Sequence, residues 1–164
     1  MSKIVVISCS NTDIKKSINY DLANKIATMG SFDFINLVDY QVDYFSNDIM
    51  DNVPDKIKEL SEKINQYNEL ILVTPEINGY LPSFAKNIFD WLSLNKKWLT
   101  NKKAYVLSAT PGMKGGPKVR RLLSDFLGYF GAEIFGSVGF SDYQLNQDRK
   151  KEIQEFVNSV ISNS

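Results

Sequence analysis

Histidine is absent from this chain, and Cys9 is the single cysteine among its 164 residues. The lack of histidine removes the usual general base near neutral pH, the commonest zinc ligand, and every Ser-His or Cys-His nucleophilic arrangement. One cysteine excludes an internal disulfide framework and favours a reducing compartment. No metal site is expected, and an enzyme of this composition would take its difficult chemistry from a bound cofactor.

The sequence also lacks a charge excess and a long apolar run. Its 19 basic and 19 acidic residues cancel, so no field of one sign recruits nucleic acid or an anionic membrane. No window approaches the roughly twenty apolar residues that span a bilayer. The apolar run from Ile4 to Ile7 is too short for a signal peptide. We therefore expect a cytoplasmic protein with neither a nucleic-acid nor a membrane partner.

Buried-strand patterns alternate with amphipathic helix patterns, without a linker or an internal repeat. Strands are predicted at residues 3–9, 32–38, 70–74, 103–109 and 133–138, and helices at 17–28, 54–66, 83–93, 119–130 and 147–161. Gly30 is expected to close the first helix as a left-handed cap. The alternation predicts a three-layer α/β/α domain over residues 1–164, with a parallel sheet. Five such units favour the flavodoxin-like strand order 2-1-3-4-5.

In that order, the loops after the first, third and fourth strands gather at one edge of the sheet. The first of these loops, residues 8–19, places Ser10, Thr12, Ser17 and Asn19 before a helix. Hydroxyls and free N–H groups at a helix start bind phosphate; the alternative is that Ser17 or Asp13 only caps the helix. Lys15 or Lys16 would add charge, unless both point into water. The P-loop and G-x-G-x-x-G patterns are absent.

The other two loops, residues 75–79 and 110–116, contain glycines and a carboxylate. Asn78-Gly79 allows backbone angles that present amides to a flat heteroaromatic ring. Glu76 acts either as a base or as a structural hydrogen-bond acceptor. The loop glycines, Gly112, Gly115 and Gly116, either admit a ligand or form a flexible connector. Cys9 is either a redox thiol or a small packed residue at a strand end.

Residues 74–93, TPEINGYLPSFAKNIFDWLS, resemble the pattern T-P-E-Y-N-G-S-x-P-x-x-x-K-N-x-x-D-W-L-S of the NAD(P)H-dependent FMN reductase family, which includes quinone, chromate and azo-dye reductases. Residues 17–23, 37–48 and 112–116 are also similar to the family. The resemblance implies a flavodoxin-like oxidoreductase that passes electrons from NADH or NADPH through bound FMN to a small acceptor. The implied acceptor is a quinone, free flavin, azo compound or metal oxyanion, and the implied assembly is a homodimer or homotetramer.

The resemblance also assigns the site. It implies that Ser10, Thr12, Ser17, Ile18 and Asn19 hold the phosphate, and that Pro75, Glu76, Ile77, Asn78, Gly79, Thr110, Gly112, Gly115 and Gly116 border the isoalloxazine ring. The flavin carries the chemistry, so no side chain is assigned as a catalytic acid or base. The helix from Ser83 would lie at a subunit contact, with Phe84 and Trp91 in the core, at an interface or stacked on a ligand. Tyr80 would then cover the partner's flavin.

The chain departs from the family pattern in the sequence and length of its first loop, residues 10–17 being about two residues longer than usual, and at Ile77. The family's first loop reads G-S-x-R, whereas residues 9–12 read Cys-Ser-Asn-Thr, and Ile77 replaces the usual tyrosine. Losing the arginine is expected to weaken FMN binding, because charge-assisted hydrogen bonds are about twice as strong as neutral ones. The altered first loop motivates one alternative, a flavodoxin-like scaffold that no longer binds flavin. A separate alternative is an electron carrier that does not oxidise a pyridine nucleotide.

Overall fold

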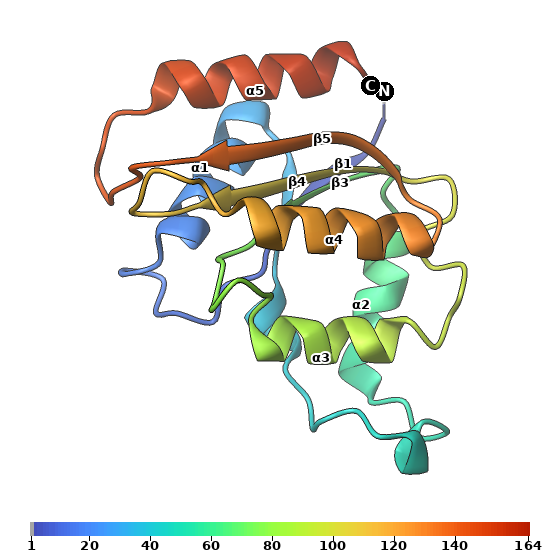
Figure 1. Ribbon diagram of the computed structural model, residues 1–164. Helices are drawn as coiled ribbons and strands as arrows, with labels where there is room; N and C mark the ends of the chain where they lie inside the picture. The colour runs from blue at the N-terminus through green and yellow to red at the C-terminus, as the bar shows by residue number, and fades with distance from the viewer. Residues whose placement is uncertain (1) are drawn as a thin grey trace.

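The computed structural model describes residues 2–164 as a parallel sheet covered by helices on both faces (Figure 1). The strands are β1 Ile4–Ser8, β2 Asp33–Asn36, β3 Glu69–Val73, β4 Lys103–Ala109 and β5 Glu133–Phe140. The α-helices are α1 Ile18–Gly30, α2 Asp55–Asn65, α3 Ser83–Leu92, α4 Pro117–Tyr129 and α5 Lys150–Ser162. Short 3₁₀ helices, η1 Leu37–Tyr40 and η2 Asn47–Ile49, follow β2.

The strand order is β2-β1-β3-β4-β5, and all four pairings are parallel. This confirms the predicted order. The chain direction across the sheet reverses at β1, which lies between β2 and β3. Crevices that bind ligands in such sheets lie beyond the carboxyl ends of the strands at this switch point.

Two apolar cores explain why the strands are apolar at consecutive positions. Val5 and Leu70 belong to the core under α2, α3 and α4, whereas Val6 and Ile71 belong to the core under α1 and α5. Figure 1 shows α5 on one side of the sheet and α3 and α4 on the other. Because the central strands are covered on both faces, every residue of β1 and β3 is buried.

Several predicted ends differ from the observed ones by one to three residues, and the differences at β2, α1 and α5 have a clear physical cause. The second strand stops at Asn36 because its one neighbour, β1, ends at the paired Ser8; the chain then turns into η1, which buries Leu37 and Tyr40. The left-handed cap of α1 is Ser31, with φ 52°, and not Gly30. Gly30 stays helical, and a Cβ there would lie 2.2 Å from the Phe32 ring. The last helix begins at Lys150, three residues later than predicted, since residues 141–149 form a connecting loop.

The segment between η1 and α2 is held by two side chains of α3. Asn87 accepts a hydrogen bond from Phe45 N at 2.7 Å and donates to the carbonyls of Val42 and Asp43, both at 3.2 Å. Trp91 Nε1 donates to Asp43 O at 3.0 Å. Phe84 and Trp91 are 7% and 2% exposed, so both belong to the core of this chain. Their burial leaves neither ring face available to a ligand.

Candidate functional site

The first, third and fourth connecting loops start side by side at the carboxyl edge of the sheet. Cys9 N donates to Val73 O at 2.8 Å, Thr74 N donates to Leu107 O at 2.9 Å, and Thr110 N donates to Phe140 O at 3.0 Å. These bonds extend the ladder one residue beyond each strand. The loops therefore leave the sheet from fixed starting points.

A cavity of about 180 Å³ opens among these loops. It is lined by predicted residues of all three loops and by three further residues. The predicted ones are Ser10, Thr12, Ser17, Ile18, Asn19, Pro75, Glu76 and Thr110, and the others are Lys16, Ala109 and Pro111 with the start of α1 beside them. The remaining predicted residues, Ile77, Asn78, Gly79, Gly112, Gly115 and Gly116, lie outside this lining.

Two buried hydroxyls meet at the first turn of α1. Ser17 Oγ accepts from Tyr20 N at 3.0 Å, which makes Ser17 the N-cap, and it donates to Ser10 Oγ at 2.8 Å. Ser10 Oγ also accepts from Thr12 N at 3.3 Å. Ser10 accepts both of these bonds, so its own proton has no acceptor among residues 2–164. A hydroxyl in this state is a donor for an anion.

Backbone donors lie next to these hydroxyls. The first N–H groups of a helix have no partner within the helix, and Ser17 satisfies those of Tyr20 and Asp21. The N–H groups of Ile18 and Asn19 have no hydrogen-bond acceptor in the described part of the chain. Lys16 adds an exposed cation to the cavity lining, whereas Lys15 is outside it. Together with the positive end of the α1 dipole, this set favours a bound anion.

The Asn19 side chain has a different task. Its Nδ2 donates to Ala109 O at 2.9 Å and its Oδ1 accepts from Ala109 N at 2.8 Å. Asn19 is 3% exposed. Both polar groups of the amide are used inside the protein, so only the backbone N–H of Asn19 is available to a ligand.

The second loop is a tight two-residue hairpin. Ile77 and Tyr80 exchange two backbone hydrogen bonds of 2.9 Å across Asn78 and Gly79. Asn78 and Gly79 have φ 52° and 81°, the positive values that such a turn requires. The side chains of Ile77 and Tyr80 are 51% and 65% exposed at the surface. The hairpin therefore presents apolar side chains, while the backbone N–H of Ile77 is already used.

Glu76 joins the second loop to α4. Its Oε2 accepts from Val119 N at 3.1 Å, in the first turn of α4, whose own N-cap, Gly116, offers no side chain. This geometry agrees with the structural alternative for Glu76. Burial lowers the pKa of the nearby Arg120, and the Glu76 charge partly offsets that shift.

The glycines of the third loop are required by contacts within the chain. Gly115 and Gly116 have φ 59° and 61°. A Cβ on Gly115 would lie 2.9 Å from the Gly139 backbone, and one on Gly116 would lie 2.5 Å from Ser108 Oγ. Only Gly112 has open space around it, with nothing within 4 Å of a built Cβ. The loop is thus packed onto β4 and β5 rather than loosely connected.

Comparison with known proteins agrees with this arrangement. The model of the NADPH-dependent FMN reductase family matches residues 2–145. The chain belongs to this family. Membership confirms the resemblance and makes the chain an NAD(P)H-dependent oxidoreductase that uses FMN.

This FMN reductase family member is similar to a curated protein along its whole length. It is 34% identical over 166 residues to the uncharacterized MG342 homolog of Mycoplasma pneumoniae, with 97% of this chain and 96% of the relative covered. It is 31% identical over 88 residues to a quinone reductase of Escherichia coli K12. That match covers 53% of this chain and 47% of the relative, so it spans less than half of the quinone reductase.

A solved structure shares the fold. The flavoenzyme FerB, an NAD(P)H:(acceptor) oxidoreductase from Paracoccus denitrificans, superposes with a TM-score of 0.84 at 19% identity. The superposition covers 99% of this chain and 96% of FerB. At this identity the likeness concerns the fold alone, and it agrees with the flavodoxin-like strand order.

The residues of this family member fit one end of FMN. The free Ser10 proton, the two free N–H groups of α1 and Lys16 form a donor set of the kind that a phosphate needs. Cys9, by contrast, is fully buried, and desolvation raises the pKa of its thiol to about 12. A thiol held in the protonated form is a poor nucleophile, which favours the packing role for Cys9.

Two contributions to this edge were not predicted from the sequence. Ala109 and Pro111 line the cavity on either side of the predicted Thr110. The loop after β5 also reaches the site, since Asp142 N donates to Gly112 O at 3.1 Å and Tyr143 N donates to Thr110 O at 3.0 Å. Ala109 and Pro111 could have been found from their position beside Thr110. No pattern in the sequence indicated the second contact.

Substitution of Glu76 separates its two possible roles. We expect Glu76→Gln to keep the acceptor oxygen and therefore the stability and turnover of the parent protein. Glu76→Ala should lower the free energy of unfolding by about 1 kcal/mol, the usual cost of losing a helix cap. Urea unfolding and steady-state turnover measure the two effects. A loss of turnover in Glu76→Gln at unchanged stability would contradict the structural role and support a base.

Proposed function

We propose that the chain binds FMN at the carboxyl edge of the sheet and uses it to reduce a small aromatic acceptor with electrons from NADPH or NADH. The observation that carries the proposal is the convergence of free donors at the first turn of α1, where Ser10, Ile18 and Asn19 each offer one proton. In this proposal these donors, with Thr12, Ser17 and Lys16, hold the phosphate. Bound FMN would supply the hydride acceptance and electron transfer.

The other two loops border the ring in this proposal. The residues involved are Pro75, Glu76, Ile77, Asn78, Gly79, Thr110, Gly112, Gly115 and Gly116. Glu76 and the packed glycines fix the loops rather than contact the ring through side chains. The protein thus supplies position and shape, and no side chain acts as an acid or base. The lack of an acid or base side chain agrees with a sequence that contains no histidine.

Exposed apolar side chains favour a flat aromatic acceptor, such as a quinone, over a hydrated metal oxyanion. Ile77, Tyr80 and Met113, on the second and third loops, are 51%, 65% and 84% exposed. Apolar surface of this kind gains free energy by covering an aromatic ring, and offers no charge-assisted hydrogen bond to an oxyanion. The similarity to a quinone reductase over 88 residues supports the same choice.

Two further parts of the proposal concern location and assembly. The single cysteine favours the cytoplasm, and none of the helices in residues 2–164 is long and apolar enough to cross a membrane. We also propose a homodimer or homotetramer, because Tyr44 and Tyr80 are exposed apolar side chains on segments next to α3. Light scattering on the purified protein should give a mass of two or four chains; a mass of one chain at micromolar concentration would contradict this.

Purification and anaerobic mixing test the proposed function directly. The purified protein, or the protein after addition of FMN, should be yellow and should release FMN on denaturation. NADPH or NADH should bleach the flavin absorbance in a stopped-flow experiment, and a benzoquinone should restore it faster than chromate does. A flavin that binds but is not bleached would favour the electron carrier. Failure to bind added FMN would favour the scaffold.

Lys16 and Lys15 form a matched pair of substitutions for the phosphate end. Lys16→Ala should raise the dissociation constant for FMN about tenfold, because it removes a charge-assisted contact in a cavity that has no arginine. Lys15→Ala should leave the constant unchanged, since Lys15 lies outside the lining. Fluorescence titration of the apoprotein measures both. Equal effects of the two substitutions would show that only net charge matters.

A further inference from the structure

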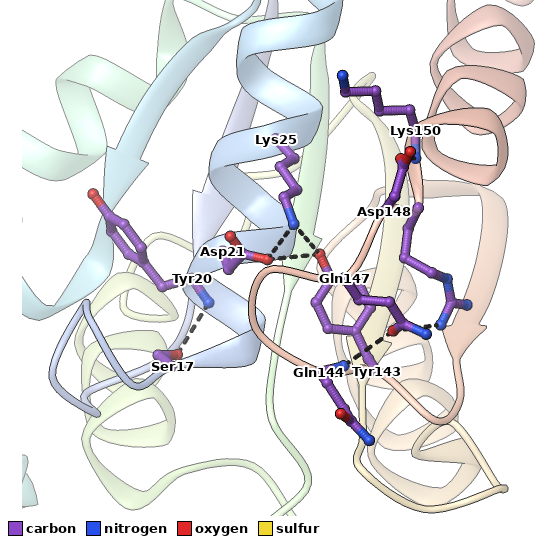
Figure 2. A network of polar contacts seen from close by, with 10 residues as sticks. Ser17, Tyr20, Asp21, Lys25, Tyr143, Gln144, Gln147, Asp148 and Lys150 are labelled. Atoms are coloured by element: carbon purple, nitrogen blue, oxygen red, sulfur yellow. Dashed lines mark hydrogen bonds and ion pairs between the residues drawn. The ribbon is translucent and has the colours of Figure 1, made fainter.

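Tyr143 is a fully buried tyrosine in the loop between β5 and α5. Figure 2 shows its hydroxyl pointing at the start of α1, where it donates to Asp21 Oδ2 at 2.8 Å. Lys25 Nζ lies 2.7 Å from the same carboxylate oxygen and 3.4 Å from the Tyr143 hydroxyl. Burial and the Asp21 hydrogen bond both raise the pKa of Tyr143, so the phenol remains protonated and continues to donate.

The backbone of the same residue binds a different loop. Tyr143 N donates to Thr110 O at 3.0 Å, and the preceding N–H, of Asp142, donates to Gly112 O at 3.1 Å. Thr110 and Gly112 belong to the loop that borders the ring in the proposed function. Asp21, at the other end of the contact, lies in the first turn of α1 after the N-cap Ser17 (Figure 2). This is the turn that also contains the free N–H groups of Ile18 and Asn19. One residue therefore connects the ring-side loop to the phosphate-side helix start.

The groove beside Tyr143 is lined by cations that are mostly paired within the chain, so it is not proposed as a ligand site. A cavity of about 550 Å³ lies there, with Lys25, Arg149 and Lys150 in its lining. Lys25 is paired with Asp21, and Arg149 is paired with Glu152 and donates to Ser141 O at 3.0 Å. Since two of the three cations are already neutralised by partners of the chain, these contacts hold the loop in place.

Resting on the proposed function, we propose that Tyr143 is a positioning residue: through Asp21 and Thr110, it fixes the phosphate-binding turn of α1 relative to residues 110–116. When the separation of the two ends is set before binding, FMN engages both without first ordering them. A site that must be ordered during binding loses affinity by that ordering cost. Without the Tyr143 connection, the phosphate would contribute less to the affinity for FMN. Each half of the site could still bind its own part of FMN, the phosphate or the ring.

Tyr143→Phe tests this with a minimal change. It removes one hydroxyl and keeps the ring and the backbone bonds. The matched control is Tyr105→Phe: Tyr105 is 2% exposed, lies in the same core, and its hydroxyl makes no hydrogen bond to α1 or to residues 110–116 in the described chain. The readout is the ratio of the dissociation constants of riboflavin and FMN, which isolates the phosphate contribution.

We expect Tyr143→Phe to weaken FMN binding about tenfold and riboflavin binding less than about twofold, so that the ratio falls. Tyr105→Phe should leave the ratio unchanged. Hydrogen exchange of the apoprotein should be faster at the hydrogen-bonded N–H groups of Tyr20, Asp21, Thr110 and Gly115 in Tyr143→Phe alone. Asp21→Ala, at a side chain that is 25% exposed, should reproduce the lower ratio and provides the test if Tyr143→Phe does not fold.

The outcomes separate this proposal from the function on which it rests. A lower melting temperature for Tyr143→Phe with an unchanged riboflavin-to-FMN ratio would overturn the positioning role and leave the proposed function intact. An equal fall of the ratio in Tyr105→Phe would overturn it as well. Wild-type protein that binds neither flavin would overturn the proposed function, and the positioning role with it.

Discussion

Two hydrogen bonds between Asn19 and Ala109 determine where the first turn of α1 lies. They join residues that are 90 positions apart, with lengths of 2.9 and 2.8 Å, and they are buried. β4 ends at Ala109, so the pair holds the start of α1 at the carboxyl edge of the sheet. An unpaired buried amide would cost roughly 1–3 kcal/mol for each lost partner. The free N–H groups of Ile18 and Asn19 consequently have a fixed place in the cavity.

The loops of the site are fixed by similar contacts rather than by ligand. Glu76 caps α4, Gly115 packs against Gly139, and Tyr143 binds Thr110 from the loop after β5. Each of these contacts connects a loop to an element that is distant in sequence. Binding to such a preformed site costs little ordering of the chain. When a cofactor supplies the chemistry, the chain mainly has to hold that cofactor in position, and a preformed site does this.

Much of the fold followed from local patterns. Consecutive apolar residues in β1 and β3 indicated strands covered on both faces, and strict alternation indicated a parallel sheet whose order the structure confirms. Local patterns were wrong where a partner decides the end of an element. β2 stops where β1 stops, and Gly30 is glycine because the Phe32 ring packs on it. Neither partner can be identified from the residue itself.

The candidate site divides in the same way. Its location followed from the loops that a 2-1-3-4-5 sheet brings together, and all five phosphate-side residues of the prediction line one cavity. The tasks of individual side chains did not follow. Asn19 was predicted to bind phosphate, but its side-chain amide makes both of its hydrogen bonds to Ala109. Tyr143 belongs to no sequence motif that would indicate its contact with Asp21. Those tasks depend on pairings across 90 residues or more, which periodicity does not encode.

The departure of the first loop from the family pattern has a physical consequence for the whole edge. An arginine would hold a phosphate bidentately from one side chain. In the proposed FMN site the donors are a serine hydroxyl, two backbone N–H groups and the exposed Lys16. Each neutral donor binds phosphate more weakly than an arginine would, so several donors must contact it together. They can do so only if the first turn of α1 has a fixed position relative to the other loops. The loss of a single strong ligand therefore raises the importance of the contacts made by Asn19 and Tyr143.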